Sequence, residues 1–270
     1  MAGDDNEPMT SHPAATALPQ GAVRLSDWGL IRARGPEAAM FLHGQLTQDI
    51  EHLPEDQARL AGYCSAKGRL LATFVVWRHG PDEILLACSA DLLPAVLKRL
   101  TMFVLRAKCK LSDATTELPL WGLAGTAANQ APVADWGRAA TVDGEVVRLP
   151  PALVDGVPVP RALQAGGAPA ANDALDIDAW RWLEVHSAVA RVTAATSEQF
   201  VPQMVNLDLV GGVNFQKGCY PGQEVVARST NIESRFNTTG SRSALQASRT
   251  SSGPRRHITK VARRRPFAEQ

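Results

Sequence analysis

The sequence predicts an α+β protein built mainly from antiparallel sheets. Its 270 residues are 45% hydrophobic and 20% charged, which is the composition of an ordinary globular protein that can bury a sizeable core. Runs that favour strands, such as residues 70–77, adjoin tight turns. Segments with apolar residues at helical spacing lie between these runs. Strand–helix–strand units combined with hairpins are typical of the α+β class.

The first half of the chain provides most of the predicted elements. Residues 22–33 indicate a pair of strands around Asp27-Trp28-Gly29, and Gly35-Pro36 opens a helix, because proline suits a first helical position. The apolar residues of this helix recur at helical spacing: Ala38, Phe41, Leu42 and Leu46. The next predicted elements are a hairpin at 63–77 with its turn at 66–69, a strand at 84–88, a helix at 90–103 and a strand at 105–111.

The second half is predicted to hold fewer elements. Short strands are expected at 120–123 and 146–149, a surface loop at 165–171 and a helix at 173–189. The pattern then changes, because twelve of the 42 residues in 229–270 are Ser or Thr and nine are Lys or Arg. Such a composition, without strand or helix periodicity, indicates disorder. We therefore expect a flexible leader at 1–20, a folded region at 21–230 and a disordered basic tail at 231–270.

Charge and cysteine content argue against several classes of protein, among them nucleic-acid binders, membrane proteins and metalloproteins. Residues 229–270 hold nine basic and two acidic residues, whereas 1–228 hold 19 basic and 25 acidic residues, so the body gives no electrostatic reason to bind nucleic acid. No apolar run approaches the roughly 18 residues of a membrane span. The four cysteines form no CxxC pair, and no His/Cys constellation indicates a metal site. Few cysteines and no signal-like leader predict a cytoplasmic protein with free thiols.

Residues 217–224 carry the most informative chemistry. Cys219 lies two residues after Lys217 and just ahead of Pro221-Gly222, after which a helix can begin. An adjacent ammonium group and a helix N-terminus both favour a thiolate, so Cys219 and Lys217 are the candidate catalytic residues. The alternative is a small buried thiol in a glycine-rich turn, which is a common setting for a free cysteine.

Four stretches at matching intervals resemble motifs of the YgfZ family, which is related to the glycine-cleavage T-protein. They are residues 217–224 (KGCYPGQE, against KGCYxGQE), 41–49 (FLHGQLTQD, against FLQGQxTxD), 64–69 (CSAKGR, against CDAKGR) and 200–207 (FVPQMVNL), the stretch that leads into the first. The resemblance covers roughly residues 21–230. It implies the T-protein fold, with antiparallel sheets flanked by helices around a central pocket for tetrahydrofolate or another reduced folate.

The resemblance also implies a function and partners. Members of the family support the assembly or repair of iron–sulfur proteins, including enzymes that modify tRNA. Trp28 and Trp180 fall at the family's two folate-contacting tryptophans, and a flat pterin ring favours an aromatic face. The alternative is that both are core tryptophans, as most of the six must be.

One departure affects the cofactor site. The family has an acid in its Ile-Glu-Ala-Gly-like run, and that acid aligns with His186 here. Glu184 stands four residues after Trp180, on the same helical face, and is expected to replace the lost acid in binding the pterin N–H groups. His186 is expected on a different face.

Two alternative functions remain at this stage. A one-carbon transferase of the T-protein class requires a carboxylate against the folate N5/N10 region. An RNA-binding module would use the basic tail. Homologues continue beyond the signature with a β-barrel domain, whereas the resemblance here stops near Asn231, so a frameshift that replaces this domain is a further hypothesis for residues 231–270.

Overall fold

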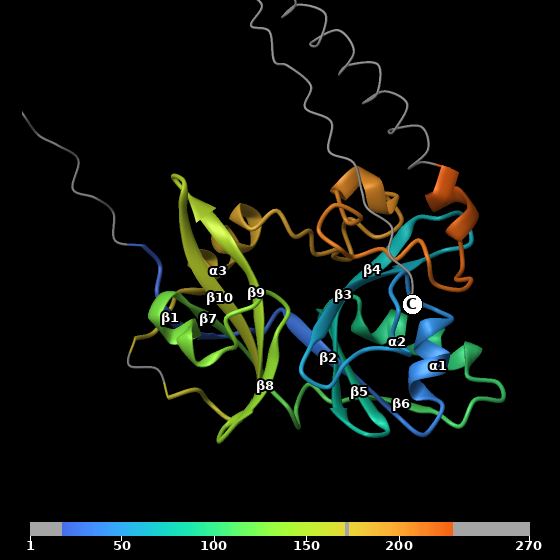
Figure 1. Ribbon diagram of the computed structural model, residues 1–270, viewed down its shortest axis with the longest axis horizontal. Coiled ribbons are helices and arrows are strands. Elements are labelled where there is room, and N and C mark those ends of the chain that lie inside the picture. Colours follow the sequence, from blue (N-terminus) through green and yellow to red (C-terminus); the bar gives the residue numbers. More distant parts are fainter. Residues whose placement is uncertain (1–17, 171–172, 229–270) are drawn as a thin grey trace, which may run out of the picture. The chain divides into compact units, whose positions relative to one another are not determined.

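The computed structural model describes residues 18–170 and 173–228, and these residues form two five-stranded antiparallel sheets (Figure 1). Sheet A has the order β1 (Gly21–Arg24), β7 (Leu120–Ala124), β10 (Val157–Gly166), β9 (Gly144–Val154), β8 (Arg138–Thr141). Sheet B has the order β3 (Ala58–Cys64), β4 (Leu70–Gly80), β5 (Glu83–Ser89), β2 (Trp28–Arg34), β6 (Lys110–Asp113). The predicted α+β class with antiparallel sheets is confirmed.

The named α-helices are α1 (Ala38–His43), α2 (Leu93–Phe103) and α3 (Ile177–His186), and a further α-helical stretch occupies 223–228 at the end of the described residues. Two short 3-10 helices occupy Gly125–Gln130 and Pro202–Val205. The start of α3 is fixed by its N-cap, since the Asp176 carboxylate accepts hydrogen bonds from the backbone N–H groups of Asp178 and Ala179. Within α3, Trp180 and Leu183 are the buried residues and face the core.

Sheet B is buried on both faces. Along β4, Val75 and Trp77 join the apolar cluster shared with sheet A, whereas Phe74 and Val76 join the cluster on the opposite face. This is the period of two expected of a strand. Figure 1 shows sheet B between sheet A on the left and helices α1 and α2 on the right. The sheet therefore separates two cores.

The predicted hairpin at 63–77 and the predicted strand at 84–88 are confirmed by β3, β4 and β5. The predicted pairing within residues 22–33 is wrong, because β1 pairs with β7 in sheet A and β2 pairs with β5 and β6 in sheet B. The chain crosses from one sheet to the other within residues 25–27. Hydrogen bonds from Leu25 N to Leu120 O and from Trp28 N to Leu25 O hold this crossing.

Other boundaries differ from the predictions in ways that have local causes. The strand predicted at 105–111 begins only at Lys110, because the chain turns between Ala107 and Cys109. Strand β10 was not predicted and extends into the expected loop as far as Gly166. Pro158 and Pro160 weaken its strand signal, and the register shift between Val159 and Arg161 accommodates them. The predictions for residues 231–270 lie outside the described residues.

Candidate functional site

A pocket lies beside sheet B, and it is lined by Trp28, Val75 and Leu149 of the cluster shared with sheet A together with Leu60 and Phe74 of the other cluster. Its cavity volume is about 30 Å³, room for a water molecule or two, so a larger ligand can enter only if a lining side chain moves. The lining residues come from five strands, the loop before β8, α3 and the segment after α3: Trp28, Leu60, Thr73, Phe74, Val75, Trp136, Leu149, Pro150, Arg161, Glu184, Val189, Ala190 and Arg191. The pocket is thus mostly apolar, with a few charged groups that determine its chemistry.

Arg191 is the most highly connected of these charged groups. Its Nε donates to Glu184 Oε1 at 3.2 Å, and its Nη2 donates to Glu184 Oε2 at 3.2 Å and to Asp27 Oδ2 at 3.0 Å. Its Nη1 donates to the Asp27 backbone oxygen and to Ser89 Oγ, both at 3.1 Å. The guanidinium carbon lies 4.9 Å from the centroid of the Trp28 ring, within cation–π distance. Arg191 therefore links α3, β2 and the end of β5.

Glu184 is a buried acid with a perturbed pKa. Desolvation raises the pKa of its carboxyl group, and the charge and hydrogen bonds of Arg191 oppose this rise. The Glu184 side chain lines the pocket, and its contact with a folate stays a prediction. His186 faces elsewhere, with its Nδ1 2.9 Å from the Trp182 backbone oxygen and its ring stacked on Trp182.

Trp180 supports the pocket from beneath and does not line it. The side chain is completely buried, and the guanidinium of Arg161 lies 5.5 Å from its ring centroid. A Cβ atom at Gly122 of β7 would come within 2.7 Å of this ring, so glycine is needed there for the ring to lie against the strand. Arg161 is itself buried, and desolvation lowers its pKa to about 10. Direct contact of Trp180 with a folate stays a prediction.

Three buried polar atoms at this site have no hydrogen-bond partner among the described residues: Asp27 Oδ1, Trp28 Nε1 and Trp180 Nε1. Buried polar groups are usually paired, so these atoms mark places where a polar ligand or water can bind. Asp27, Arg161 and Arg191 were missed in the sequence. The sequence could have indicated Asp27, because it adjoins Trp28, but no motif or spacing pointed to Arg191.

The predicted thiol site lies on the other face of sheet B. Tyr220 within the signature and Val226 just after it pack in the same apolar cluster as Phe74 and Val76. Trp28 and Trp180 belong to the cluster on the opposite face. The five predicted site residues therefore form two groups, with Trp28, Trp180 and Glu184 at the pocket and Lys217 and Cys219 across the sheet.

Lys217 turns inward and binds the end of α1. Its Nζ donates to the backbone oxygens of His43 and of Leu46, the latter at 2.6 Å, and lies 5.0 Å from the Tyr220 ring centroid. Desolvation lowers its pKa from 10.5 to about 8, against the opposing charges of Asp49 and Cys219.

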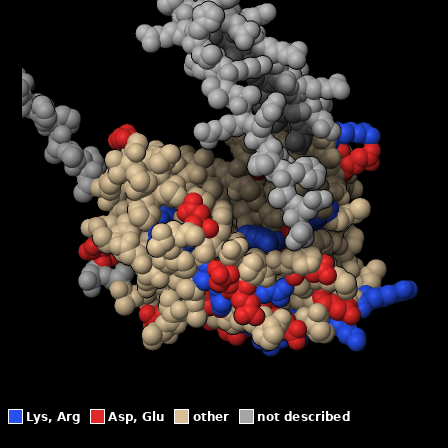
Figure 2. Space-filling model, in the orientation of Figure 1, with Lys and Arg blue, Asp and Glu red and all other residues tan. Residues whose placement is uncertain are grey.

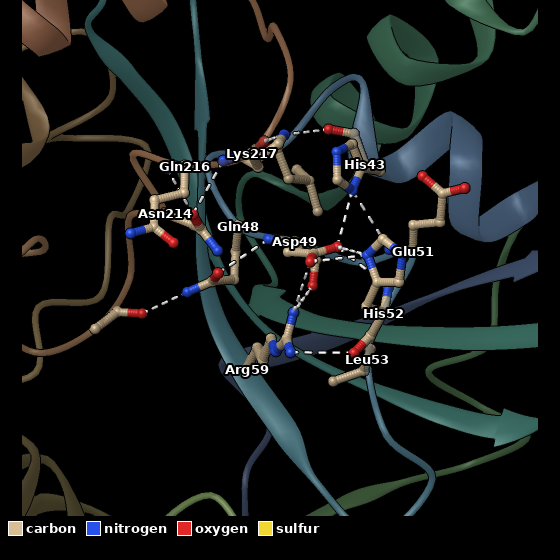
Figure 3. A network of polar contacts seen from close by, with 12 residues as sticks. His43, Gln48, Asp49, Glu51, His52, Leu53, Arg59, Asn214, Gln216 and Lys217 are labelled. Carbon is tan, nitrogen blue, oxygen red and sulfur yellow. Dashed lines mark hydrogen bonds and ion pairs between the residues drawn. The ribbon is translucent and has the colours of Figure 1, made fainter.

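A polar network surrounds this lysine (Figure 3). The Asp49 carboxylate lies 3.0 Å from Nδ1 of His43 and 3.0 Å from Nδ1 of His52. The Asn214 side chain accepts hydrogen bonds from the backbone N–H groups of Gln216 and Lys217, which shapes the loop that carries the signature.

The four resembling motifs converge here. Thr47 Oγ1 donates to Gly212 O at 2.6 Å and accepts from Gly62 N at 2.7 Å, so the 41–49 motif holds the signature loop against β3. A Cβ atom at Gly222, where φ is +80°, would lie 2.4 Å from Ser65 O, so only glycine allows the 64–69 hairpin to pack so closely. These contacts explain why the motifs occur together.

Neither a metal site nor a membrane-spanning helix occurs among the described residues. Within 18–170 and 173–228, no group of three or more His, Cys, Asp and Glu side chains is arranged to hold a metal ion. In the same residues, no helix is long and apolar enough to cross a membrane.

Comparison with known proteins identifies similar sequences. The chain is 32% identical over 232 residues to the tRNA-modifying protein YgfZ of Serratia proteamaculans, covering 80% of this chain and 68% of that protein. It is 33% identical over 242 residues to the protein of the same name from Edwardsiella ictaluri, covering 83% and 72%. No family model matches the sequence.

The fold also resembles a solved structure. The glycine cleavage system aminomethyltransferase T of Bartonella henselae superposes with a TM-score of 0.53 at 16% sequence identity, over 80% of this chain. The chain spans 64% of the length of that protein. At this identity the likeness concerns the fold alone.

We predict that Cys219 is the first thiol to react with iodoacetamide at pH 8. Cys219 is exposed, whereas burial raises the pKa of Cys64 and of Cys88 to about 12 and that of Cys109 to about 11. Timed labelling of the native protein followed by peptide mass mapping gives the order. Earlier labelling of any of the other three cysteines would show that the assignment is wrong.

We also predict that Lys217 makes the free energy of unfolding rise with pH between about 8 and 10.5. In this window Lys217 has lost its proton in the folded protein but still binds one in the unfolded chain, so raising the pH favours folding. The free energy of unfolding of the wild type minus that of Lys217→Met should increase by on the order of 1–3 kcal/mol from pH 8 to 10.5. Urea denaturation at several pH values measures it, with exposed Lys98→Met as the control. A difference that stays flat or shrinks contradicts the prediction.

Proposed function

Since this chain belongs to the family of the tRNA-modifying protein YgfZ, we propose that it binds a reduced folate such as tetrahydrofolate and supports tRNA modification. The observation that carries the proposal is the pocket beside sheet B. It is lined by the largely buried carboxylate of Glu184 and by the indole of Trp28, and the unpaired oxygen Asp27 Oδ1 belongs to the residue just before Trp28. Buried carboxylates and an aromatic ring in a mostly apolar pocket are suited to a flat heterocycle with N–H donors.

The residues present fit the pterin end of a folate. Glu184 and Asp27 would accept hydrogen bonds from its N–H groups, because ionised acceptors form the stronger bonds. Trp28 would cover one face of the ring, and Trp180 would hold Arg161 beneath the pocket through their contact. A bound tetrahydrofolate would supply nitrogen atoms that carry a one-carbon unit.

We further propose that the protein serves iron–sulfur enzymes, including those that modify tRNA, as the family resemblance implies. Cys219 is exposed on the face of sheet B away from the pocket. A partner protein would therefore reach this thiol from solvent without entering the folate pocket. In this arrangement the folate affects partners through the protein, not by contact with Cys219.

The alternative activity, one-carbon transfer, has less support. It requires a carboxylate free to act near N5 and N10 of the bound folate, and Glu184, the acid that lines the pocket, is assigned here to the N–H groups of the pterin ring. Formation of methylene-tetrahydrofolate from an aminomethyl donor would favour the transferase. The RNA-binding alternative rests on residues outside the described ranges. On the face drawn in Figure 2, basic and acidic side chains of the described residues lie intermingled over its lower half.

We predict that tetrahydrofolate binds and quenches tryptophan fluorescence, and that Glu184→Gln and Trp28→Leu each weaken binding about ten- to a hundredfold. Each substitution removes a contact whose loss costs on the order of 1–3 kcal/mol. Isothermal titration calorimetry measures the affinities.

Two matched controls accompany these variants. Trp182→Leu removes an exposed tryptophan on another face of α3, and Cys219→Ser alters the opposite face of sheet B. Both should bind like the wild type. Unchanged affinity in folded Glu184→Gln and Trp28→Leu would rule out this pocket as the folate site.

A further inference from the structure

Arg191 already uses the polar and aromatic contacts that the pocket offers to a ligand. An arginine has five N–H donors, and each of those of Arg191 has an acceptor within 3.2 Å on Glu184, Asp27 or Ser89. Its flat guanidinium lies over Trp28. The carboxylate and the ring that should recognise a ligand are thus engaged by a side chain of the protein itself.

The chemistry of this engagement resembles that of the expected ligand. The 2-amino-4-oxopyrimidine ring of a pterin contains a cyclic guanidine, whose ring N–H and amino group point in the same direction. A guanidinium presents the same planar pair of donors to a carboxylate, as Arg191 Nε and Nη2 do to the two oxygens of Glu184. Glu184 and Trp28 therefore form a subsite for a planar guanidine, filled by either group but not by both.

We propose that the Arg191 guanidinium occupies the place of the pterin ring in the ligand-free protein. Arg191 must then move away from Glu184 and Trp28 before the ligand can bind. The inference rests on the proposed function and adds that binding is an exchange, with one planar guanidine replacing another. It also makes Arg191 a determinant of specificity. A ligand without the 2-amino group cannot replace both hydrogen bonds to Glu184, and an unpaired buried carboxylate is costly.

Space into which the Arg191 side chain can move lies next to the pocket. A second, outer hollow adjoins the pocket and shares Glu184, Val189, Ala190 and Arg191 with it. The pair formed by Glu184 and Arg191 therefore lies at the boundary between the two hollows. Arg191 follows α3 in a segment without regular secondary structure, so its side chain can turn outward without breaking a helix or a strand.

The test compares two small probes that differ by one group. The first, 6-methylpterin, has the 2-amino group, and the second, 6-methyllumazine, has an oxygen in its place. We expect Arg191→Gln to bind 6-methylpterin about tenfold more tightly than the wild type, because the competing guanidinium is gone; this is about 1.4 kcal/mol. The affinity for 6-methyllumazine should change less than twofold. Calorimetry measures both.

Two further variants keep the test decisive. Arg181→Gln removes a neighbouring arginine that pairs with Asp27 and Asp178, and it should bind both probes like the wild type. Arg191→Lys retains a positive charge beside Glu184 but lacks the planar fork. If Arg191→Gln fails to fold, Arg191→Lys should still tighten 6-methylpterin several-fold.

The outcomes separate the two proposals. Wild-type binding of 6-methylpterin with equal or weaker binding by folded Arg191 variants overturns the exchange and leaves folate binding intact. Equal tightening of both probes also overturns it, because the subsite would then not recognise the guanidine. Failure of tetrahydrofolate and 6-methylpterin to bind any variant overturns the proposed function and this inference with it.

Discussion

The burial of sheet B on both faces is the constraint on which the placement of every candidate functional residue depends. Successive side chains of a strand point to opposite faces, so β4 sends Val75 and Trp77 toward sheet A and Phe74 and Val76 toward the helices. Trp28, Val75 and Leu149 of the pocket belong to the face that meets sheet A, and the signature loop packs on the other face. A single sheet thereby keeps a ligand pocket and an exposed thiol apart.

Each face of sheet B carries a desolvated ionisable group with a shifted pKa. At the pocket, desolvation raises the pKa of Glu184 and Arg191 opposes this, so the acid and the arginine depend on one another. Across the sheet, desolvation lowers the pKa of Lys217, and two backbone oxygens at the end of α1 accept its N–H groups. In both places an ionisable group fixes the position of a neighbouring segment as well as its own.

The features that sequence reasoning recovered are local ones. The β-prone run of β4 and the turn before it predicted the hairpin, and the four-residue spacing from Trp180 placed Glu184 on the inner face of α3. The pairing of Arg191 with Asp27 spans 164 positions, and no spacing rule reaches that far. The crossing between sheets at 25–27 was missed for the same reason, since β1 and β2 look like neighbours until their distant partners are known.

The central claim is that folate binds on the sheet A side of sheet B, away from the signature loop. Hydrogen exchange with and without saturating tetrahydrofolate, followed by mass spectrometry, tests it directly. The account predicts slower exchange in peptides that contain residues 184–192 and 27–30, and unchanged exchange in residues 214–226. Protection confined to 214–226, or no protection at saturation, would contradict it.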